Sequence, residues 1–379
     1  MRLHSLSSDA GLIYIAHNDD QDARGRMNKA SQSGDGPCTF LVGPNSALTV
    51  LQADDRLRVV ADDVTVLELR LDREVDHLHV LYASDDQKLT TQAMSASAEA
   101  LFAWRPNLDR LVLDVVGQDS IVRDLITSGV ATIAKDRLVL VPEMVMQRRD
   151  NWLVNPERQP LPQLHVMTDG KRHPRRAPKP TGKVYSRYIP WLAQSVSFQI
   201  ADIDDHLHLL HRWMNDPRVD AFWNEAGDLE KHRRYLADKL ADPHMLPMIG
   251  CFGDEPFGYF EIYWAKENRI APFYDADDYD RGWHVVVGND AFRGRSYISA
   301  WLPSLLHYMF LDDCRTQRIV GEPAAAHSQQ IRNLERSGFA KIKNFDFPHK
   351  RATLVMLLRE RFFGDRLWLP APGSPVVLS

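Results

Sequence analysis

The sequence predicts a mixed α/β protein made of two related halves, of which the second carries the chemistry. Three observations support this prediction. Strand and helix patterns alternate along the chain, one strand–helix–strand segment occurs twice, and an apolar strand with a histidine leads through a basic glycine turn into a long helix. Main-chain N–H groups at such a helix start can hold a pyrophosphate, and the strand beside it can present a bound group to a base.

The composition of the chain bounds its class. Its 379 residues suffice for two domains, and 44% hydrophobic with 26% charged residues is typical of a soluble globular protein. The formal charge of −5 argues against a general nucleic-acid binder, which usually presents a basic face. Three cysteines without short spacing predict reduced thiols in a cytoplasmic protein. We expect no metal site, no secretory signal and no membrane span, because no pattern for them is found.

A proline-rich, basic stretch at residues 147–190 is the predicted boundary between the halves. Residues 1–146 would form a scaffold domain, and residues 191–379 the working domain. The basic side chains of the stretch either form a solvated linker face, or pack near the active site or a partner and help to hold an anionic group.

The closing segments of the two halves are similar, because residues 121–133 are echoed by residues 331–342 between two apolar strands. The shared positions are Arg123, Leu125, Ser128, Gly129, Ala131 and Ile133 in the first half, and Arg332, Leu334, Ser337, Gly338, Ala340 and Ile342 in the second. The matching order of elements favours an internal duplication over chance similarity. Before its helix, predicted at about residues 93–104, the first half carries Asp85 and Asp86, which disfavour a phosphate.

The second half predicts helices at residues 207–214 and 229–240, and strands at 248–252, 257–264 and 283–287. A further helix has an apolar stripe over residues 298–310, with Pro303 inside it, which predicts a kink or a late helix start. Helix, helix, strands, strand with glycine turn, helix, strand, helix and strand is the layout of the GNAT acyltransferase fold. The predicted fold class is therefore α/β with a mixed central sheet flanked by helices, preceded by a degenerate GNAT-like half.

Particular motifs in the second half narrow this resemblance. They are His173-Pro174, Lys179-Pro180, Gly182, Val184-Tyr185, Arg187-Tyr188, residues 211–219, Phe222-Trp223, Gly258, Glu261, Tyr263-Trp264, residues 280–284 and Glu322-Pro323. Together they resemble the siderophore-biosynthesis acyltransferases: the aerobactin-type hydroxylysine acetyltransferases, the mycobactin acyltransferases and the fungal hydroxyornithine transacylases. The resemblance covers about residues 173–363, roughly half of the chain.

The resemblance implies that His284 is a general base for an attacking hydroxylamine nitrogen, while the residues alone also allow a hydrogen-bonded core histidine. Strand alternation places His284 on one face with Val286, opposite Trp283. The family has an aspartate directly after Glu-Pro, and this chain has Ala324 there. Either His284 suffices, or Glu322 or His327 compensates, or the enzyme is impaired.

The glycine turn is the expected binding site for an acyl-CoA, although it matches the usual GNAT pattern only in part. The expected cofactor-binding residues are Val286, Val287, Arg293, Gly294, Arg295, Ser296, Tyr297 and Arg332. Gly294 allows close approach of the main chain, the arginines supply charge, and Val286 and Val287 would pair with the pantetheine arm as an added strand does.

The acceptor pocket should offer a carboxylate and an aromatic wall. The candidates are Trp213, Asn215, Trp223, Glu261, Tyr263 and Asp280. For the aromatic residues core packing is an equal alternative, and for Asn215 the alternative is a helix C-cap and turn.

The resemblance thus implies transfer of an acyl group, expected to be acetyl, from acyl-CoA to the N-hydroxylated side chain of ornithine or lysine by direct attack. The rivals are an N-acetyltransferase of amines or antibiotics, and a non-catalytic acyl-CoA-binding subunit of a siderophore assembly complex. Expected partners are the small hydroxylamine acceptor, siderophore-pathway enzymes and a second copy of the chain in a homodimer.

Overall fold

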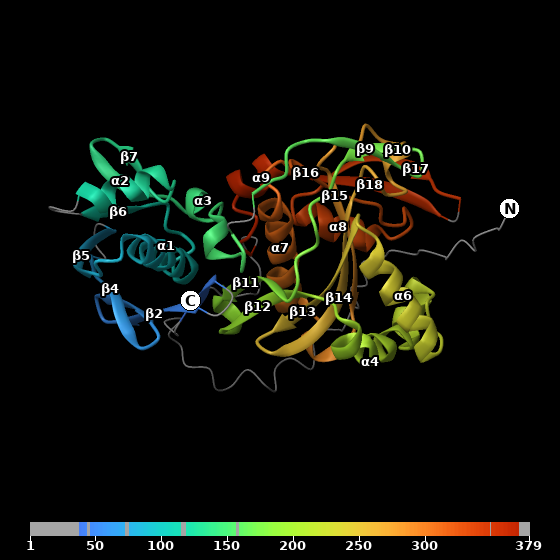
Figure 1. Cartoon of the computed structure of the whole chain (residues 1–379), viewed down its shortest axis with the longest axis horizontal. Helices are drawn as coiled ribbons and strands as arrows, with labels where there is room; N and C mark the ends of the chain where they lie inside the picture. Colours follow the sequence, from blue (N-terminus) through green and yellow to red (C-terminus); the bar gives the residue numbers. More distant parts are fainter. Residues whose placement is uncertain are drawn as a thin grey trace.

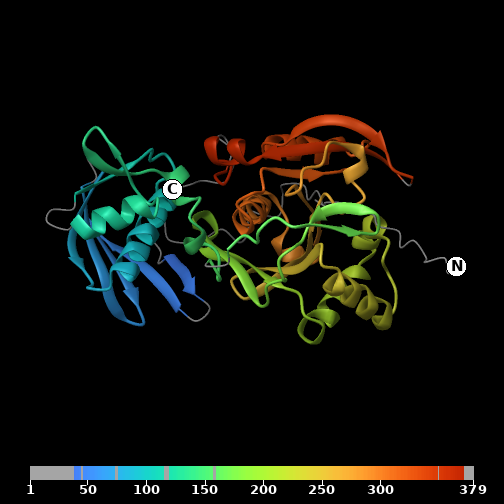
Figure 2. The same cartoon turned by 45° about the horizontal axis from the view of Figure 1, so that its top comes forward.

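The structure is a computed structural model that describes residues 38–43, 46–72, 76–114, 119–156, 159–348 and 350–370. Two eight-stranded mixed sheets, each with its own hydrophobic core, lie side by side in the molecule (Figures 1 and 2). Within these described residues no helix combines the length and the apolar character needed to cross a bilayer.

The first sheet has the strand order β1-β2-β3-β4-β5-β6-β8-β7. Its strands are β1 (Cys38–Gly43), β2 (Ser46–Ala53), β3 (Arg56–Ala61), β4 (Val64–Asp72), β5 (His77–Ala83), β6 (Leu111–Asp114), β7 (Thr132–Ala134) and β8 (Arg137–Leu140). Helix α1 (Gln87–Trp104) packs on this sheet, and α2 (Asp119–Thr127) follows β6. Helix α1 begins earlier than the predicted residue 93, because Asp86 caps it by accepting the Leu89 N–H at 3.0 Å.

The second sheet has the order β11-β12-β13-β14-β15-β16-β18-β17. Its strands are β11 (Lys183–Ile189), β12 (Gln194–Ile200), β13 (Met245–Phe252), β14 (Glu255–Trp264), β15 (Arg281–Val287), β16 (Arg318–Gly321), β17 (Ala340–Asp346) and β18 (Arg351–Leu358). Its helices are α4 (Ile203–Met214), α5 (Pro217–Trp223), α6 (Leu229–Ala241), α7 (Arg295–Asp312), α8 (Ser328–Arg336) and α9 (Arg359–Gly364). The late start considered for α7 is wrong, since the helix runs through Pro303.

The two sheets therefore share one topology, including a single parallel pair, β5 with β6 and β15 with β16. The sequence repeat falls on equivalent places: Gly129 after α2 and Gly338 after α8 both have positive φ, 74° and 94°. The halves differ between their second and third strands. A tight turn joins β2 to β3, whereas α4, α5 and α6 separate β12 from β13.

The segment between the sheets is packed structure rather than an extended spacer. It contains α3 (Pro142–Val145), the 3-10 helix η2 (Arg149–Asn151) and the hairpin β9 (His165–Thr168) with β10 (Lys171–Pro174). Trp152 and Leu153 belong to the core of the second half. The solvated-linker interpretation does not hold for Arg176, which pairs with Glu267, or for Lys179, which donates to the Lys239 and Leu240 carbonyls at the end of α6.

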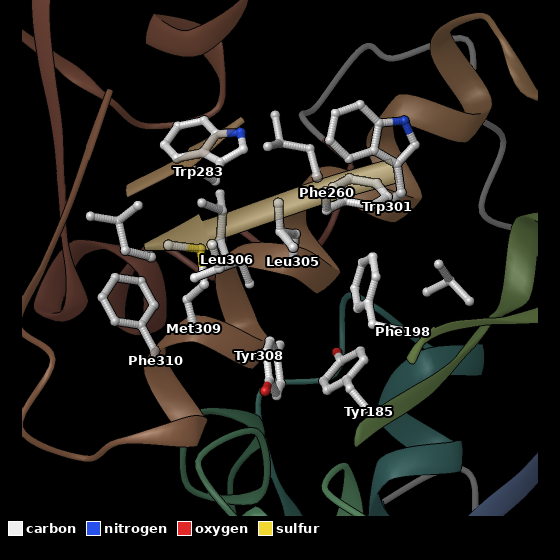
Figure 3. Close-up of a cluster of buried hydrophobic side chains, with 14 of the residues drawn as sticks. Tyr185, Phe198, Phe260, Trp283, Trp301, Leu305, Leu306, Tyr308, Met309 and Phe310 are labelled. Carbon is white, nitrogen blue, oxygen red and sulfur yellow. The ribbon is translucent and has the colours of Figure 1, made fainter. Parts of the chain in front are cut away.

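The face on which each β15 side chain lies is set by packing. Trp283, Val285 and Val287 belong to the core beneath α7, while Val286 packs with the α4–α6 cluster on the other face. Figure 3 shows Trp283 and Phe260 from the sheet beside Trp301 and Leu305 of α7. The alternation predicted from the sequence is confirmed, and it places His284 on the α4–α6 face.

Substitution of Trp152 tests whether the intervening segment belongs to the core. Trp152→Ala should lower the free energy of unfolding by about 3–5 kcal/mol, because the side chain is 1% exposed among apolar neighbours. Urea unfolding measures the change. Met167→Ala is the control, since Met167 lies in the same segment but is 64% exposed, and it should change stability by less than about 0.5 kcal/mol. Equal effects of both substitutions would contradict the assignment.

Candidate active site

Strands β15 and β16 separate partway along their length. Strand β14 pairs with all of β15, from Gly258 opposite Val287 to Trp264 opposite Arg281. Strand β16 pairs with β15 only at Arg281 and Gly282. In the part of the chain that the structure describes, residues 283–287 therefore have a strand partner on one side only. Such an edge offers main-chain N–H and C=O groups to an extended ligand.

Helix α7 begins close to the end of this edge, after the short turn that holds the 3-10 helix η5 (Asp290–Phe292). Gly294 is the N-cap residue and has φ of 107°, a conformation that a residue with a side chain rarely adopts. The first N–H groups of α7, from Arg295 onward, point out of the helix start with the positive end of its dipole. This is a suitable place for a phosphate.

The side chains of the glycine turn differ in their surroundings. Arg293 donates to the Val287 carbonyl and pairs with Asp290, both at 2.9 Å. Arg295 and Ser296 are exposed, whereas Tyr297 packs against the aromatic core. Arg332 is exposed on α8, where it donates to Gln329.

His284 lies between two buried carboxylates. Its Nδ1 is 3.1 Å from Glu261 Oε2, and its Nε2 is 3.4 Å from Glu322 Oε1. All three side chains are less than a tenth exposed. Glu261 is directly opposite His284 on β14, and Glu322 follows the end of β16, so the strand separation and the three ionisable groups lie at one place.

Donors from several elements hold Glu261 in its charged form. Tyr235 of α6 and Tyr259 of β14 both donate hydrogen bonds to Glu261 Oε1, and Lys239 Nζ lies 3.6 Å from the same atom. Burial alone would raise the pKa of Glu261, but Lys239 together with the hydrogen bonds from His284 and Tyr235 lowers it to about 2.

Glu322 has a similar environment on the other side of the ring. Tyr263 donates to Glu322 Oε2 at 3.0 Å, and Arg269 donates to Oε1 at 3.4 Å. Burial opposes ionisation, yet His284, Lys350 and Arg269 hold the pKa of Glu322 well below its usual range.

The two carboxylates determine the charge of the imidazole. Burial lowers the pKa of His284, but hydrogen bonds and charges from Glu261 and Glu322 outweigh burial and raise it. The raised pKa favours the protonated ring, which would donate from Nδ1 to Glu261 and from Nε2 to Glu322. Glu261 fixes the orientation of the ring, and the Nε2 proton is shared with a second carboxylate, so the His284–Glu322 pair can accept and return a proton.

Two of the predicted acceptor-site aromatics lie near this cluster. Trp223 stands edge-on to His284, with ring centroids 6.2 Å apart, and its N–H donates to Tyr235. The Tyr263 ring is 4.9 Å from the His284 ring. Trp213 instead lies over Gly288, where an added Cβ would be 2.1 Å from the indole, and it packs in the α4–α6 cluster.

The other predicted residues make contacts elsewhere. The Asn215 amide bonds the main chain of His211 and Gly227, which is the helix-end arrangement considered as its alternative. Asp280 accepts from Arg318 and Tyr274. His327 precedes α8, and its ring lies edge-on to Phe222 with centroids 5.7 Å apart.

Sequence reasoning missed Tyr235, Lys239, Tyr259 and Arg269. Two signals were present. Tyr235 and Lys239 are four residues apart, so they share one face of α6, and Tyr259 shares a face of β14 with Glu261. Nothing in the local sequence indicates that Arg269, in the β14–β15 loop, reaches Glu322.

A second histidine cluster lies near the β9–β10 hairpin. His173, His244 and Glu267 bring possible metal-ligand atoms within 4.8 Å of one another. Arg176 forms two hydrogen bonds with the Glu267 carboxylate, at 2.5 and 2.8 Å, and His173 bonds Thr168 at 2.9 Å. His173 Nδ1 also lies 3.0 Å from Glu267 Oε1, so the hairpin and the residues that follow it are linked to the β14–β15 loop.

Comparisons with known proteins identify the family of this chain. The family model described as an acetyltransferase (GNAT) domain matches residues 202–347. A putative lysine N-acyltransferase of Schizosaccharomyces pombe is 47% identical over 189 residues, covering 50% of this chain and 57% of that protein. The N(6)-hydroxylysine O-acetyltransferase of Escherichia coli is 43% identical over 217 residues, covering 56% of this chain and 68% of that protein.

A fungal relative is similar over the same region. The N(5)-hydroxyornithine:cis-anhydromevalonyl coenzyme A-N(5)-transacylase of Beauveria bassiana is 47% identical over 195 residues, covering 50% of this chain and 43% of that protein. The chain thus spans 43–68% of the length of these three curated relatives. A solved structure of an uncharacterized Bacillus halodurans protein has a TM-score of 0.47 at 25% identity, covering 50% of this chain and 96% of that one.

The fold is that of a mixed α/β protein whose central strands β15 and β16 separate. The chain belongs to the GNAT acetyltransferase family. The family uses an acyl-CoA as co-substrate.

Removal of one carboxylate tests the charge of the ring. Glu261→Gln should lower the pKa of His284, because one charge and the acceptor for Nδ1–H are weakened. Because the pKa of His284 is raised in the folded protein, protonation of this ring stabilises the fold. This contribution is fully present below the unfolded histidine pKa of about 6.5, and it is lost as the pH rises through the pKa of the folded protein. NMR titration of labelled histidine Cε1 measures both proteins.

The matched control for this titration is Glu225→Gln, which removes a buried carboxylate that pairs with Lys231 instead of His284. It should leave the His284 pKa unchanged. A wild-type His284 that titrates below 6.5, or a value that Glu261→Gln does not lower, would contradict the assignment.

Proposed function

We propose that the protein transfers an acyl group from acyl-CoA to the hydroxylated side-chain nitrogen of an amino acid and so forms a hydroxamate. The observation that carries this proposal is the Glu261–His284–Glu322 cluster at the separation of β15 and β16. The names of the relatives support the acceptor class, since two of them act on hydroxylysine or hydroxyornithine. Siderophore biosynthesis is the process that such a hydroxamate serves.

The strand edge and the helix start would bind the acyl-CoA. The N–H groups of Arg295, Ser296 and Tyr297 would hold the pyrophosphate, with the exposed Arg295 adding charge. The pantetheine arm would lie along Val286 and Val287 as an added strand. The Val287 carbonyl already accepts from Arg293, so we assign the pairing to the other main-chain groups of this edge. A main-chain N–H of the same edge would polarise the thioester carbonyl.

The proton steps fall to the His284–Glu322 pair rather than to His284 alone. The acceptor nitrogen attacks the thioester carbon, and its proton passes to Glu322. The nitrogen becomes strongly acidic as it bonds to that carbon, so a carboxylate of low pKa suffices. The C–S bond breaks, and the imidazolium Nε2–H gives a proton to the leaving thiolate, after which Glu322 returns one to the ring. The pair takes one proton from the acceptor nitrogen and gives one to the thiolate, so its protonation state is restored at the end of the reaction.

The proposal assigns a second catalytic group although Ala324 stands in the family's aspartate position. The Ala324 main chain forms a β-bridge with Ala352 of β18. Glu322, two residues earlier, contacts the His284 ring. Glu322 thereby fills the place of a second catalytic group. His327, the other candidate for compensation, is given no step, because its ring contacts Phe222.

Turnover of defined acceptors tests the proposal. The protein with acetyl-CoA should release free CoA with N6-hydroxylysine or N5-hydroxyornithine, and not with lysine, ornithine or cadaverine. Acetylation of the unhydroxylated amines would favour an amine acetyltransferase. Binding of CoA without turnover on any of the five acceptors would favour a non-catalytic binding subunit.

A histidine variant tests the assigned residue. His284→Gln should lower kcat by about 10²–10⁴-fold while the Kd for CoA, measured by calorimetry, stays within about twofold. His208→Gln is the matched control, because His208 is exposed on α4, and it should keep full activity. Full turnover in His284→Gln would remove His284 from the mechanism.

A further inference from the structure

Two cations flank Glu322 on loops that no step of the mechanism uses. Arg269, from the β14–β15 loop, donates to Glu322 Oε1 at 3.4 Å. Lys350, from the turn between β17 and β18, donates to the Glu322 main-chain carbonyl at 2.9 Å. Both lie over the ring of Phe347, at 5.3 and 5.7 Å from its centroid. Two loops that are distant in sequence thus bring two basic side chains to one side of the His284–Glu322 pair.

The exposure of these groups shows where a ligand can approach. The side chains of Glu322 and His284 are 1% and 7% exposed, whereas that of Arg269 is 25% exposed. Arg269 therefore connects the buried pair with the protein surface. The other cation of the cluster, Lys239, contacts Glu261 on the opposite side of the imidazole ring.

Three further cations contact these two carboxylate residues. Lys239 lies beside Glu261, and Arg269 and Lys350 lie beside Glu322. Burial, together with Arg269, lowers the pKa of Lys350, although Glu322 opposes the shift. A carboxylate that enters near Arg269 and Lys350 would be attracted to both side chains.

We propose that Arg269, assisted by Lys350, binds the carboxylate of the acceptor amino acid while its hydroxylated side-chain nitrogen reacts beside His284 and Glu322. This inference rests on the proposed function and adds the residues that recognise the carboxylate of the acceptor. The acceptor is an N-hydroxylated amino acid with a free carboxylate, not an N-hydroxylated diamine. A guanidinium suits this task because its planar fork matches a carboxylate.

The distances fit such an acceptor. Arg269 Nη2 and His284 Nε2 each lie 3.4 Å from Glu322 Oε1, so they are separated by no more than twice that distance. The terminal nitrogen and the carboxylate carbon are five bonds apart in ornithine and six in lysine, so an extended zigzag of bonds of about 1.5 Å spans roughly 6–8 Å. One acceptor can therefore reach both the guanidinium and the proton-transfer pair.

Two pairs of acceptors that differ only by the carboxylate test this inference. They are N6-hydroxylysine with N-hydroxycadaverine, and N5-hydroxyornithine with N-hydroxyputrescine. The wild-type protein should prefer the carboxylated member by roughly 10- to 100-fold in kcat/KM, which is typical of a hydrogen bond between charged groups. Arg269→Gln should reduce this preference to near one, mainly through the KM of the amino acid. Arg269→Lys should restore part of it.

Matched variants keep the outcome interpretable. Lys350→Met should reduce the same preference by a smaller factor. Arg351→Gln removes an equal charge from the neighbouring, 67% exposed position and should keep the wild-type preference. No preference in the wild-type protein, or a preference that survives in Arg269→Gln, overturns this inference and leaves the proposed function intact. No turnover with any of the four hydroxylamines overturns the proposed function, and this inference with it.

Discussion

The candidate site depends on the buried imidazole of His284, held between Glu261 and Glu322, whose charges favour its protonated form. Burying three charged groups costs several kcal/mol per ion unless each is paired and hydrogen-bonded. The protein meets this condition with donors from α6, from β14 and from the β14–β15 loop. Each of these elements must be in place for the ring to keep its charge, so the surrounding fold and the chemistry are physically linked.

The stretch between the two halves contributes to this requirement. Lys179 caps the end of α6, the helix that carries Tyr235 and Lys239, and Arg176 anchors the loop that carries Arg269 through Glu267. What reads in the sequence as a basic linker is therefore a support for both sides of the site. The support is indirect, since neither Arg176 nor Lys179 contacts the ring.

The two halves share one topology but differ at the positions where the second half carries its candidate site. In the second half, Gly294 has no side chain, so the N–H groups at the start of α7 are left for an anion. In the first half, Asp86 caps α1 with its own carboxylate and fills the corresponding place. The first half also has a tight turn where the second has α4, α5 and α6, which supply Trp223 and Tyr235. In its described residues, the first half thus keeps the sheet without these two features of the second half.

Periodicity and motifs in the sequence predicted those features that depend on residues close together in the chain. Strand alternation placed His284 on the correct face, the repeat predicted two halves of one topology, and the glycine turn predicted the start of α7. Contacts between distant segments could not be predicted in this way. The approach of Arg269 to Glu322 and the burial of Trp152 depend on how loops fold over the sheet. Asn215 and Asp280 have residue types that suit a pocket, but their partners lie within the protein.

A crystal structure with CoA and a hydroxylated lysine bound together tests the central claim most directly. The account predicts the pyrophosphate at the start of α7, the pantetheine arm in the opening between β15 and β16, and the acceptor nitrogen within hydrogen-bonding distance of the His284–Glu322 pair. A cofactor bound away from β15, or an acceptor nitrogen out of reach of that pair, would contradict it.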